Sequence, residues 1–488
     1  MISKSRTALM VLSSIMSIRM LGLFMILPVF SVYAAHMPGA DATLIGVALG
    51  MYGLTQAVFQ IPFGMLSDRI GRKPVILAGL LLLIIGSVVA ACAHSMDVLI
   101  LGRALQGMGA IGSTVLALLA DLTRDESRSK AMAFMGLSIG FAFTIAMIAG
   151  PVINHWLHLS GIFWVTGLLA IIGVLSVALI PTPPKPARNV HEPTLTTGIS
   201  IWRDFATFLN RNVAISQPSR APLAGISSST FPKKSGKSFA QVFHNRELLR
   251  LNGGIFSLHT ILTALFVAIP LLLTHDMHLS EWQQISLYLS VLVLAFMFAV
   301  PFIIIAEKKR KMKPVFIAAI IAIFVVQIGL YFFHHDIAMT VILLFAFFTA
   351  FTLLEATLPS LVSKIAPIQN KGAAMGVYSS SQFFGIFVGG AVGGLIFSHA
   401  GLSGVFAFCA GMNVLWLLFA VSMKKPPYLS TMVFPMDTRD VCEYDALASL
   451  AGVAEIAIVS SENLLYVKID KEKISEPELR NAINGGNL

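Results

Sequence analysis

The stretch Gly64 to Ile76, which reads GMLSDRIGRKPVI, sets four charged side chains between two strongly apolar segments. The segment before it, residues 45–63, and the segment after it, residues 75–93, are each long enough to cross a bilayer as a helix. Gly64 and Gly71 allow close backbone approach, and Pro74 suits the first turn of a helix. The stretch therefore predicts two membrane helices joined by a tight charged loop on one face of a bilayer.

The composition of the whole chain agrees with this local pattern. Of the 488 residues, 56% are hydrophobic and only 12% are charged. These values exclude a string of soluble domains and indicate a polytopic membrane protein. The three cysteines, Cys92, Cys409 and Cys442, are far apart and form no C-x-x-C pair, so we expect no disulfide framework, no metal site and no cofactor.

Apolar segments of membrane length recur along the chain, six on each side of a polar region. They are residues 8–33, 42–66, 75–93, 97–121, 131–153, 161–181, 250–274, 283–306, 314–333, 337–361, 372–398 and 402–423. We expect an all-α polytopic fold with twelve transmembrane helices in two six-helix bundles, residues 1–181 and 250–425. The polar region, residues 182–249, is predicted to be a flexible linker in which residues 201–210 form an amphipathic helix.

Basic residues predict how the chain is oriented in the membrane. Lys and Arg fall in alternate loops between the apolar segments, and the intervening loops contain neither. The positive-inside rule then places both termini in the cytoplasm. The net charge of +10 follows from this orientation, so it does not indicate a nucleic-acid partner.

The two halves resemble each other at an offset of 240 residues. RKPVI at 72–76 corresponds to MKPVF at 312–316, and Gly150 corresponds to Gly390. Position 308 is Lys where position 68 is Asp, so any chemistry specific to Asp68 belongs to the first half. The pattern predicts a parallel internal repeat of six helices.

The composition changes after Pro426-Pro427 to that of a small soluble domain. Strands are expected at 429–436, 453–459 and 464–469, with helices at 441–450 and 476–483. This order predicts a ferredoxin-like domain over 428–488 that ends before, or lacks, its last strand. Its sequence pattern resembles that of heavy-metal-associated domains, but the paired cysteines of those domains are absent. We therefore expect it to modulate or stabilise the helices without carrying metal.

Several motifs resemble those of known transporters. The pattern G-x-x-x-D-R-x-G-R-K-P at 64–74 resembles the loop between helices 2 and 3 of the major facilitator superfamily. RALQGMGA at 103–110, which contains Gly107, and Gly150-Pro151 resemble motifs of its drug:proton antiporter branch, although Ala146 and Asn154 stand where that branch usually has glycine. With its C-terminal domain, the chain is similar to YajR-type transporters. The resemblance implies a proton-driven exporter and leaves the substrate open.

The charged loop is predicted to act as a conformational latch. Asp68 can meet the positive end of the helix that begins near Gly372, and Arg72 can pair with Asp121. As the resemblance implies, these contacts would hold the halves in the outward-open state until a proton or strain alters them. The alternative is that Asp68 sets only topology and packing. The latch positions are Gly64, Asp68, Arg69, Gly71, Arg72, Lys73 and Asp121.

Ionisable side chains inside the expected helices are candidates for proton coupling, because charge is costly in a membrane. The candidates are Arg19, Arg103, His259 and Glu355. Glu355 is the only carboxylate well inside an expected helix, so it is the candidate proton carrier, with His259 as a second. Arg103 keeps its charge and can hold a carboxylate or a water chain. For each, the alternative is a structural ion pair or hydrogen bond between helices.

The substrate cavity is expected to be mainly apolar with few polar groups. The 34 phenylalanines and 22 methionines offer soft contacts to a lipophilic molecule, although most can equally face lipid or pack between helices. The candidate lining residues are Tyr52, Gln56, Gln60, Gln106, Gln327, Tyr378, Gln382 and Asn413.

Nine of the twelve histidines fall at the expected outer ends of helices, where neutral imidazole respects the charge rule. They are His36, His94, His155, His158, His275, His278, His334, His335 and His399. One hypothesis is that acid charges this face and biases the outer gate. The other is that they are tolerated interfacial polar residues.

Taken together, the sequence predicts a monomeric inner-membrane antiporter that exports small amphipathic or drug-like molecules in exchange for protons. A proton-coupled nutrient symporter is one alternative, and a non-transporting membrane sensor is another. An enzyme is disfavoured, because the sequence has no nucleophile–base pair, metal-ligand cluster or phosphate loop.

Overall fold

The structure is a computed structural model, and it describes two groups of residues. In the helical part these are 2–123, 125–180, 242, 244–309, 311–366 and 371–424. In the C-terminal part they are 429–435, 447, 450–459, 464–470, 473–475, 477–479 and 481. The expected amphipathic helix at 201–210 and nearly all of the expected linker lie outside the described residues.

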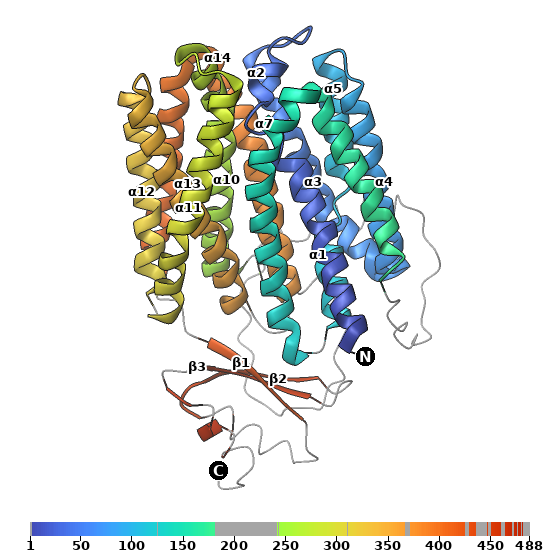
Figure 1. Ribbon diagram of the computed structural model, residues 1–488. Coiled ribbons are helices and arrows are strands. Elements are labelled where there is room, and N and C mark those ends of the chain that lie inside the picture. The colour runs from blue at the N-terminus through green and yellow to red at the C-terminus, as the bar shows by residue number, and fades with distance from the viewer. Residues whose placement is uncertain are drawn as a thin grey trace, which may run out of the picture.

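Long helices make up both halves of the chain (Figure 1). The first half contains α1 (Ile2–Phe24), α2 (Phe30–Ala34), α3 (Ala42–Ile70), α4 (Arg72–Ala91), α5 (Met96–Met108), α6 (Gly112–Leu122) and α7 (Asp125–Val177). The second half contains α10 (Arg246–Leu271), η1 (Leu272–Asp276), α11 (Glu281–Lys308), α12 (Met312–Phe333), α13 (Ile337–Ile365) and α14 (Lys371–Val421). We call the two sets the N-half and the C-half.

Among the described residues, ten helical stretches are long and apolar enough to cross a membrane. Two of them, α7 and α14, cross twice, because each contains a residue with left-handed backbone geometry at which the chain reverses. The residue is His158 in α7, with φ of 58°, and Gly401 in α14, with φ of 62°. The described chain therefore has the twelve crossings expected of it, and the all-α polytopic fold class is confirmed.

Helix boundaries differ from the sequence-based ones at three places. The expected helix at 8–33 is broken between α1 and α2, and the one at 97–121 is broken between α5 and α6. The second break lets the Gly109 backbone approach α4 so closely that an added Cβ would lie 2.4 Å from the Gly79 carbonyl oxygen. The expected linker also ends early, because the Asn245 side chain caps α10 by accepting the backbone N–H groups of Glu247 and Leu248.

One pair of lysines supports the internal repeat in three dimensions. Lys73 in the first turn of α4 donates to the carbonyl oxygen of Ile180, where α7 has just ended. Lys313 in the first turn of α12 donates to the carbonyl oxygen of Val421, the last residue of α14, at 3.0 Å. A cation at the C-terminal end of a helix satisfies carbonyls that have no partner within the helix. The same contact thus recurs 240 residues apart.

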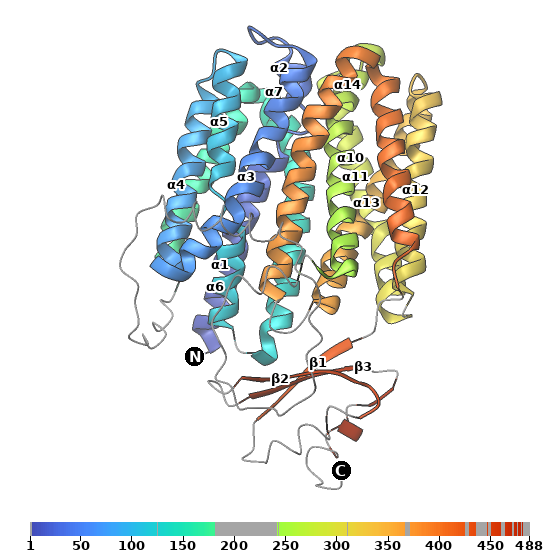
Figure 2. The same ribbon diagram turned by 180° about the vertical axis from the view of Figure 1, so that it is seen from behind.

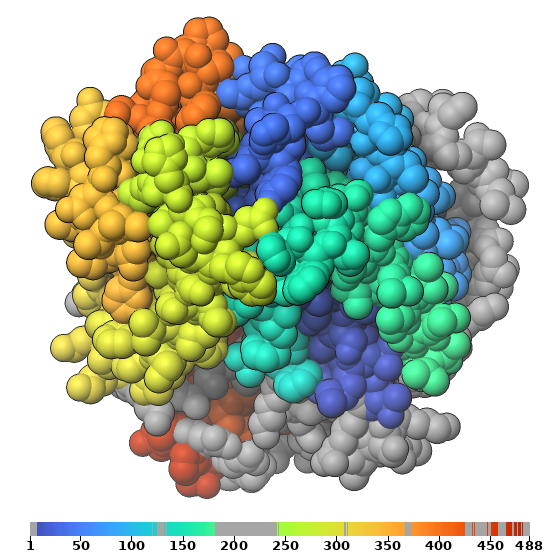
Figure 3. All heavy atoms as spheres, turned by 45° about the horizontal axis from the view of Figure 1, so that its top comes forward, coloured from blue at the N-terminus to red at the C-terminus, as the bar shows by residue number. Residues whose placement is uncertain are grey.

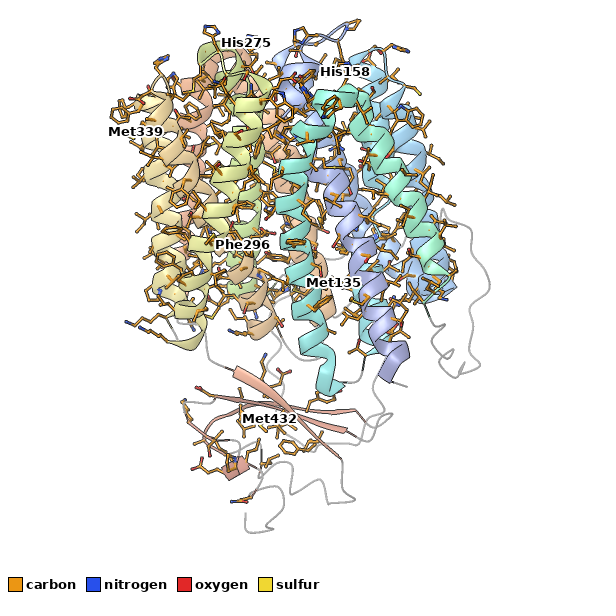
Figure 4. All side chains as sticks on the ribbon, in the orientation of Figure 1. Met135, His158, His275, Phe296, Met339 and Met432 are labelled. Carbon is orange, nitrogen blue, oxygen red and sulfur yellow. The ribbon has the colours of Figure 1, made fainter. Side chains whose placement is uncertain are left out.

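Both chain ends lie at one end of the bundle, which we call the terminal end (Figures 1 and 2). The opposite end is called the far end, and Figure 4 places the outer-face histidines His158 and His275 there. At the far end, Asp41, Ser280 and Asp336 accept backbone N–H groups and begin α3, α11 and α13. The charged loop between α3 and α4 lies at the terminal end (Figure 2).

The two halves meet most tightly along α3 and α14 near the far end. An added Cβ at Gly390 would lie 2.4 Å from the Gly46 carbonyl oxygen, and one at Gly394 would lie 2.4 Å from the Ala42 carbonyl oxygen. Glycine is required there because no side chain fits between the two backbones. We call this contact the glycine seam.

The same helices separate toward the terminal end. Gly376 lies on the α14 face that carries Phe383, Phe387 and Gly390, because the spacings of seven, four and three residues follow the helical period. An added Cβ at Gly376 would nevertheless meet nothing within 4 Å. The seam is therefore closed near Gly390 and open near Gly376, and Figure 2 shows α3 and α14 diverging in this direction.

A second contact between the halves behaves in the same way. Phe143 of α7 stacks on Phe351 of α13, with ring centroids 5.4 Å apart. One and two turns nearer the terminal end, on the same face of α7, an added Cβ at Gly140 or Gly136 would meet nothing within 4 Å. The halves thus touch from mid-height to the far end and part toward the terminal end.

The far end is also closed by polar contacts. Glu281, the first residue of α11, accepts hydrogen bonds from the Tyr33 hydroxyl of α2 and from Nδ1 of His155 in α7. The His155 ring also lies 4.8 Å from the Trp282 ring, measured between centroids. Figure 3 shows the N-half and C-half in contact across this face. We call Tyr33, His155 and Glu281 the far-end seal.

The C-terminal part forms a three-stranded sheet below the terminal end (Figure 1). The strands are β1 (Leu429–Pro435), β2 (Val453–Val459) and β3 (Leu464–Asp470), in the order β1-β3-β2, and β3 is antiparallel to both neighbours. This is the order of a split β-α-β unit, as in ferredoxin-like domains. The buried Lys468 of β3 donates to the Ala366 carbonyl oxygen at the end of α13, at 2.8 Å, which ties the sheet to the C-half.

Candidate functional site

Glu355, Gln382 and His259 form a polar cluster inside the C-half. Glu355 lies in α13, Gln382 in α14 and His259 in α10, so three helices contribute one side chain each. The Gln382 amide nitrogen lies 3.1 Å from Glu355 Oε1 and 2.9 Å from His259 Nε2. The structure thus brings together the two candidate proton carriers of the sequence, through one of the candidate cavity residues.

The hydrogen-bond directions in this cluster define its charge. The amide nitrogen of Gln382 can only donate, so His259 Nε2 accepts and its Nδ1 proton points to the Ile255 carbonyl oxygen at 3.3 Å. His259 is therefore neutral here, and Gln382 supplies one amide proton to each acceptor. An ionised Glu355 fits this arrangement, since its Oε1 accepts from Gln382.

Glu355 retains one oxygen that no described group satisfies. Its Oε2 has no hydrogen-bond partner and lies 3.8 Å from His259 Nε2. The Glu355 side chain as a whole is 29% exposed, but its Oε2 is buried, and His259 is fully buried. This oxygen can accept a proton or a cationic group without breaking an existing hydrogen bond.

The two arginines of the N-half are buried in separate polar pairs. Arg19 of α1 donates to the Gln56 side chain at 2.8 Å, and Gln56 donates in turn to Gln60 at 2.8 Å. Arg103 of α5 donates to Gln106 at 2.8 Å. Neither arginine forms an ion pair with a described carboxylate, but the bond from Arg19 of α1 to Gln56 of α3 is a hydrogen bond between helices, as the structural alternative describes.

Two aromatic rings connect Arg103 with the C-half cluster. The guanidinium carbon of Arg103 lies 5.0 Å from the centroid of the Tyr52 ring. The Tyr52 ring lies 6.4 Å from that of Phe383, the residue after Gln382. The basic site of the N-half and the acidic site of the C-half therefore lie on the two sides of the glycine seam.

The charged loop is organised around Arg72. Its guanidinium lies 2.5 Å from Asp68, 3.2 Å from Asp121 and 2.6 Å from the Ser67 hydroxyl. The expected pairing of Arg72 with Asp121 is thus present. Asp68 is 62% exposed, and the ion pair described for it is with Arg72, within the same loop. An added Cβ at Gly372, at the start of α14, would meet nothing within 4 Å, so there is open space at this helix start.

The motif glycines of the N-half allow its helices to cross closely. An added Cβ at Gly107 would lie 2.2 Å from the Tyr52 carbonyl oxygen, and one at Gly150 would lie 1.9 Å from the Met25 carbonyl oxygen. Gly71 has φ of 101°, which lets the chain turn sharply from α3 into α4.

The other cavity candidates divide into two groups. Tyr52, Gln56, Gln60 and Gln106 are buried around the two arginines. Gln327 and Asn413, by contrast, lie on α12 and the second crossing of α14, which pack against each other within the C-half. One cavity of about 380 Å³ lies at the far end, and its lining includes Asp41, His275 and Asp276.

Sequence reasoning missed two sets of residues in these sites. Ser87 of α4 accepts the Gln106 amide at 2.9 Å and so orients the residue that binds Arg103. The far-end seal was also missed as a unit, although His155 was noted among the outer histidines. A lone Glu at the start of an apolar helix gives little signal, because it resembles an ordinary capping residue.

Comparisons with known proteins now identify the family. The model of the Major Facilitator Superfamily matches residues 12–389 and 312–433, which together cover most of the chain. The chain belongs to the major facilitator superfamily. The expected family resemblance is thereby confirmed.

Individual members of the superfamily are similar over different shares of the chain. The inner membrane transport protein YajR of Escherichia coli is 41% identical over 477 residues, which covers 97% of this chain and 96% of that protein. The quinolone resistance protein NorA of Staphylococcus aureus is 28% identical over 193 residues, 38% of this chain and 49% of that protein. The expected resemblance to YajR-type transporters is also confirmed, and the chain is a multi-pass transporter of the inner membrane.

A solved structure supports the fold. The human organic anion transporter MFSD10 superposes with a TM-score of 0.57 and 19% sequence identity, covering 85% of this chain and 99% of that chain. At this identity, the likeness shows the major facilitator fold alone.

Proposed function

We propose that this major facilitator protein is a proton-coupled antiporter that exports small amphipathic or drug-like molecules by alternating access. The observation that carries the proposal is the Glu355 cluster inside the C-half, in which a membrane carboxylate has one oxygen without a hydrogen-bond partner among the described residues. Ionisable groups at this depth are expensive and are retained where they bind a transported ion. NorA, which is named as a quinolone resistance protein, supports a drug-like substrate.

The orientation of the chain determines which way the transporter faces. The alternation of basic loops supports a cytoplasmic terminal end, with both termini inside the cell. The glycine seam and the far-end seal then close the periplasmic side, and the gap at Gly136 and Gly376 faces the cytoplasm. We propose that a molecule from the cytoplasm enters through this gap and binds at Glu355 in place of a proton.

Coupling requires that proton and substrate compete for the same group. A proton on Glu355 Oε2 neutralises the carboxylate and removes its attraction for a cationic group of the substrate. Each ligand therefore weakens the binding of the other, which is the thermodynamic basis of antiport. Protons entering down their gradient then drive the substrate out.

The flux test uses proteoliposomes that contain the full-length protein and norfloxacin as a fluorescent drug-like probe. With the lumen acid and the outside alkaline, we expect probe to accumulate in the lumen as protons leave, and to leave faster when the gradient is reversed. Accumulation in the opposite direction indicates symport and contradicts the proposal. Absence of any gradient-driven flux indicates the sensor alternative. Liposomes without protein provide the background.

The charged loop acts, in this proposal, on the balance between the two conformations. In the present conformation Asp68 is 62% exposed, so its pair with Arg72 is worth about 0–1 kcal/mol. When the terminal end closes, the N-terminus of α14 comes toward Asp68 and the helix dipole adds attraction. We propose that Asp68 stabilises the outward-open conformation by this contact.

Asp68→Asn is therefore expected to leave stability almost unchanged and to disfavour the outward-open conformation. We predict a melting temperature within about 2 °C of the wild type, because a weak surface pair is lost. A single cysteine introduced by Gly372→Cys, in a cysteine-free background, should react faster with a maleimide applied from the terminal side. Glu478→Asn, in the tail, is the control. Equal reactivity in wild type and Asp68→Asn would leave the loop with topology and packing as its only role.

A further inference from the structure

The N-half contains buried positive charge without a counter-charge. Arg19 is 2% exposed and Arg103 is 0% exposed. The N-half carboxylates whose side chains are described, Asp41, Asp68, Asp97 and Asp121, all lie at helix ends, and none pairs with either arginine. A buried charge without a partner costs several kcal/mol, so this site lacks a negative group.

Arg103 offers a specific edge to such a group. Its Nη1 donates to Gln106, whereas its Nε and Nη2 are buried without a hydrogen-bond partner among the described residues. Nε and Nη2 lie on one edge of the guanidinium, and this edge binds a carboxylate through two parallel hydrogen bonds. The unsatisfied atoms therefore match a planar oxyanion in number and in geometry.

The C-half presents the opposite charge. Glu355 Oε2 has no hydrogen-bond partner, and its neighbour His259 accepts a hydrogen bond and is neutral in this arrangement. The basic side chains described in the C-half lie at helix ends, in Arg246, Arg250, Lys309, Lys311, Lys313, Lys364 and Lys424. No described cation pairs with Glu355, so this site lacks a positive group.

Aromatic rings lie beside both of these sites. Tyr52 lies against Arg103, and its ring is next to that of Phe383, beside the Glu355 cluster. Phe143 and Phe351 stack across the halves nearby, and the Phe351 ring is 5.8 Å from that of His259. A flat apolar body between two charged groups suits such surroundings.

We propose that the transported molecule is a zwitterionic amphipath whose anionic group binds Arg103 and whose cationic group binds Glu355. This inference rests on the proposed antiport function and specifies its substrate class. Arg19, held by Gln56, adds positive potential on the N-half side. Once the substrate is bound, Arg103 and Glu355 each have a counter-charge.

The opposite charges of Arg103 and Glu355 also favour a zwitterionic substrate over a singly charged one. A simple anion would bind more tightly when Glu355 is protonated, which couples its movement to protons in the same direction. A simple cation would compete with the proton but would leave Arg103 unsatisfied. A zwitterion satisfies Arg103 and still competes with the proton at Glu355, which agrees with antiport.

Three forms of one fluorescent probe test the inference on the full-length protein in detergent. Norfloxacin carries a carboxylate and a basic amine at opposite ends of a flat ring system, its ethyl ester is a cation, and its N-acetyl derivative is an anion. Binding is followed through the change in probe fluorescence. We expect wild type to bind the zwitterion at least about tenfold more tightly than either singly charged form, which corresponds to one ion pair of about 1.4 kcal/mol.

Two variants test which charged end of the probe binds at which site. Arg103→Gln should abolish the preference for zwitterion over ester, and Glu355→Gln should abolish the preference for zwitterion over N-acetyl derivative. Gln327→Leu, away from both sites, should retain both preferences. Arg103→Lys keeps the charge without the paired N–H edge and should restore only part of the preference.

Several results would overturn the inference. Equal or tighter binding of a singly charged form would do so, as would identical binding by wild type and the two variants. If a resident inorganic anion occupies Arg103, Arg103→Gln should affect zwitterion and ester alike, which also overturns it. If the protein prefers the zwitterion but shows no gradient-driven flux, the antiport proposal is contradicted, whereas the proposed substrate class is retained.

Discussion

Glu355→Gln is expected to abolish proton-driven transport while leaving the protein folded. Glutamine keeps an oxygen that accepts from Gln382, but it cannot take up and release a proton. We expect gradient-driven flux to fall by at least about 100-fold, equivalent to about 2.7 kcal/mol. The measurement is flux in proteoliposomes with and without a pH gradient, with folding checked by melting temperature.

Glu247→Gln is a matched control for this variant. Glu247 is a carboxylate of the same half, but it lies in the first turn of α10 and pairs with Arg250. It should retain most of the gradient-driven flux. If Glu355→Gln transports against a gradient as well as wild type does, the proton is carried elsewhere. His259→Gln would then be the next variant to examine.

Gly390→Val is expected to block closure of the far end without unfolding either half. Its added side chain would meet the backbones of Gly46 and Gly50 in the opposite half, with Cβ at 2.4 Å from the Gly46 carbonyl oxygen. The halves can relieve this clash by parting, which the proposed alternating-access cycle requires of them in the outward-open conformation. We expect transport to be lost and the thiol introduced by Ile45→Cys to react with an impermeant maleimide from the periplasmic side.

Gly389→Val is a control that distinguishes a side chain that holds the two halves apart from one that only disturbs packing within a half. Gly389 is the neighbouring residue, but its Cβ would lie 2.3 Å from the Thr260 carbonyl oxygen within the same half. That clash cannot be relieved by rocking, so it should cost about 1–3 kcal/mol of stability and lower the melting temperature. If Gly390→Val lowers the melting temperature as much as Gly389→Val and leaves the thiol of Ile45→Cys protected, the glycine seam is not a gate.

Much of the fold could be predicted from the sequence, because the bilayer imposes strong patterns. Apolar length gave the twelve crossings, and the repeat of RKPVI as MKPVF correctly paired the starts of α4 and α12. The strands of the tail were predicted to within about one residue, since alternation is clear in short amphipathic strands. The breaks between α1 and α2 and between α5 and α6 were missed, since the residues at each break, 25–29 and 109–111, are apolar.

The candidate site was predicted in its residues and only partly in its contacts. The free-energy cost of placing an ionisable group in a membrane was enough to single out Glu355 and His259. The structure adds that the Gln382 amide hydrogen-bonds to both. Arg103 was expected to hold a carboxylate or a water chain, and nothing in its sequence neighbourhood indicates that no described carboxylate pairs with it. Gln327 and Asn413 were chosen because polar residues are rare in membranes, but their helices face each other inside the C-half.

The conformation could not be predicted, because the same sequence must be stable in more than one conformation of a transporter. The latch was predicted from the outward-open conformation, whereas the described one is closed at the far end by Tyr33, His155 and Glu281. This seal bears on the histidine hypothesis, since His155 is bound to a carboxylate. The role of the other outer histidines stays a prediction.

The central claim is that protonation of Glu355 shifts the balance between the two arrangements of the halves. Spin labels at Gly136→Cys and Gly376→Cys report this balance, because both positions border the gap at the terminal end and have room for a label. The background carries serine in place of Cys92, Cys409 and Cys442. No substrate is needed for the measurement.

The decisive measurement is the distance distribution between these labels, recorded in lipid at pH 8 and pH 5, with and without Glu355→Gln. We expect acid to shift the wild-type distribution, whereas Glu355→Gln should give one distribution at both pH values that matches wild type at pH 5. A wild-type distribution that ignores pH, or a Glu355→Gln distribution that responds to pH as wild type does, would contradict the central claim.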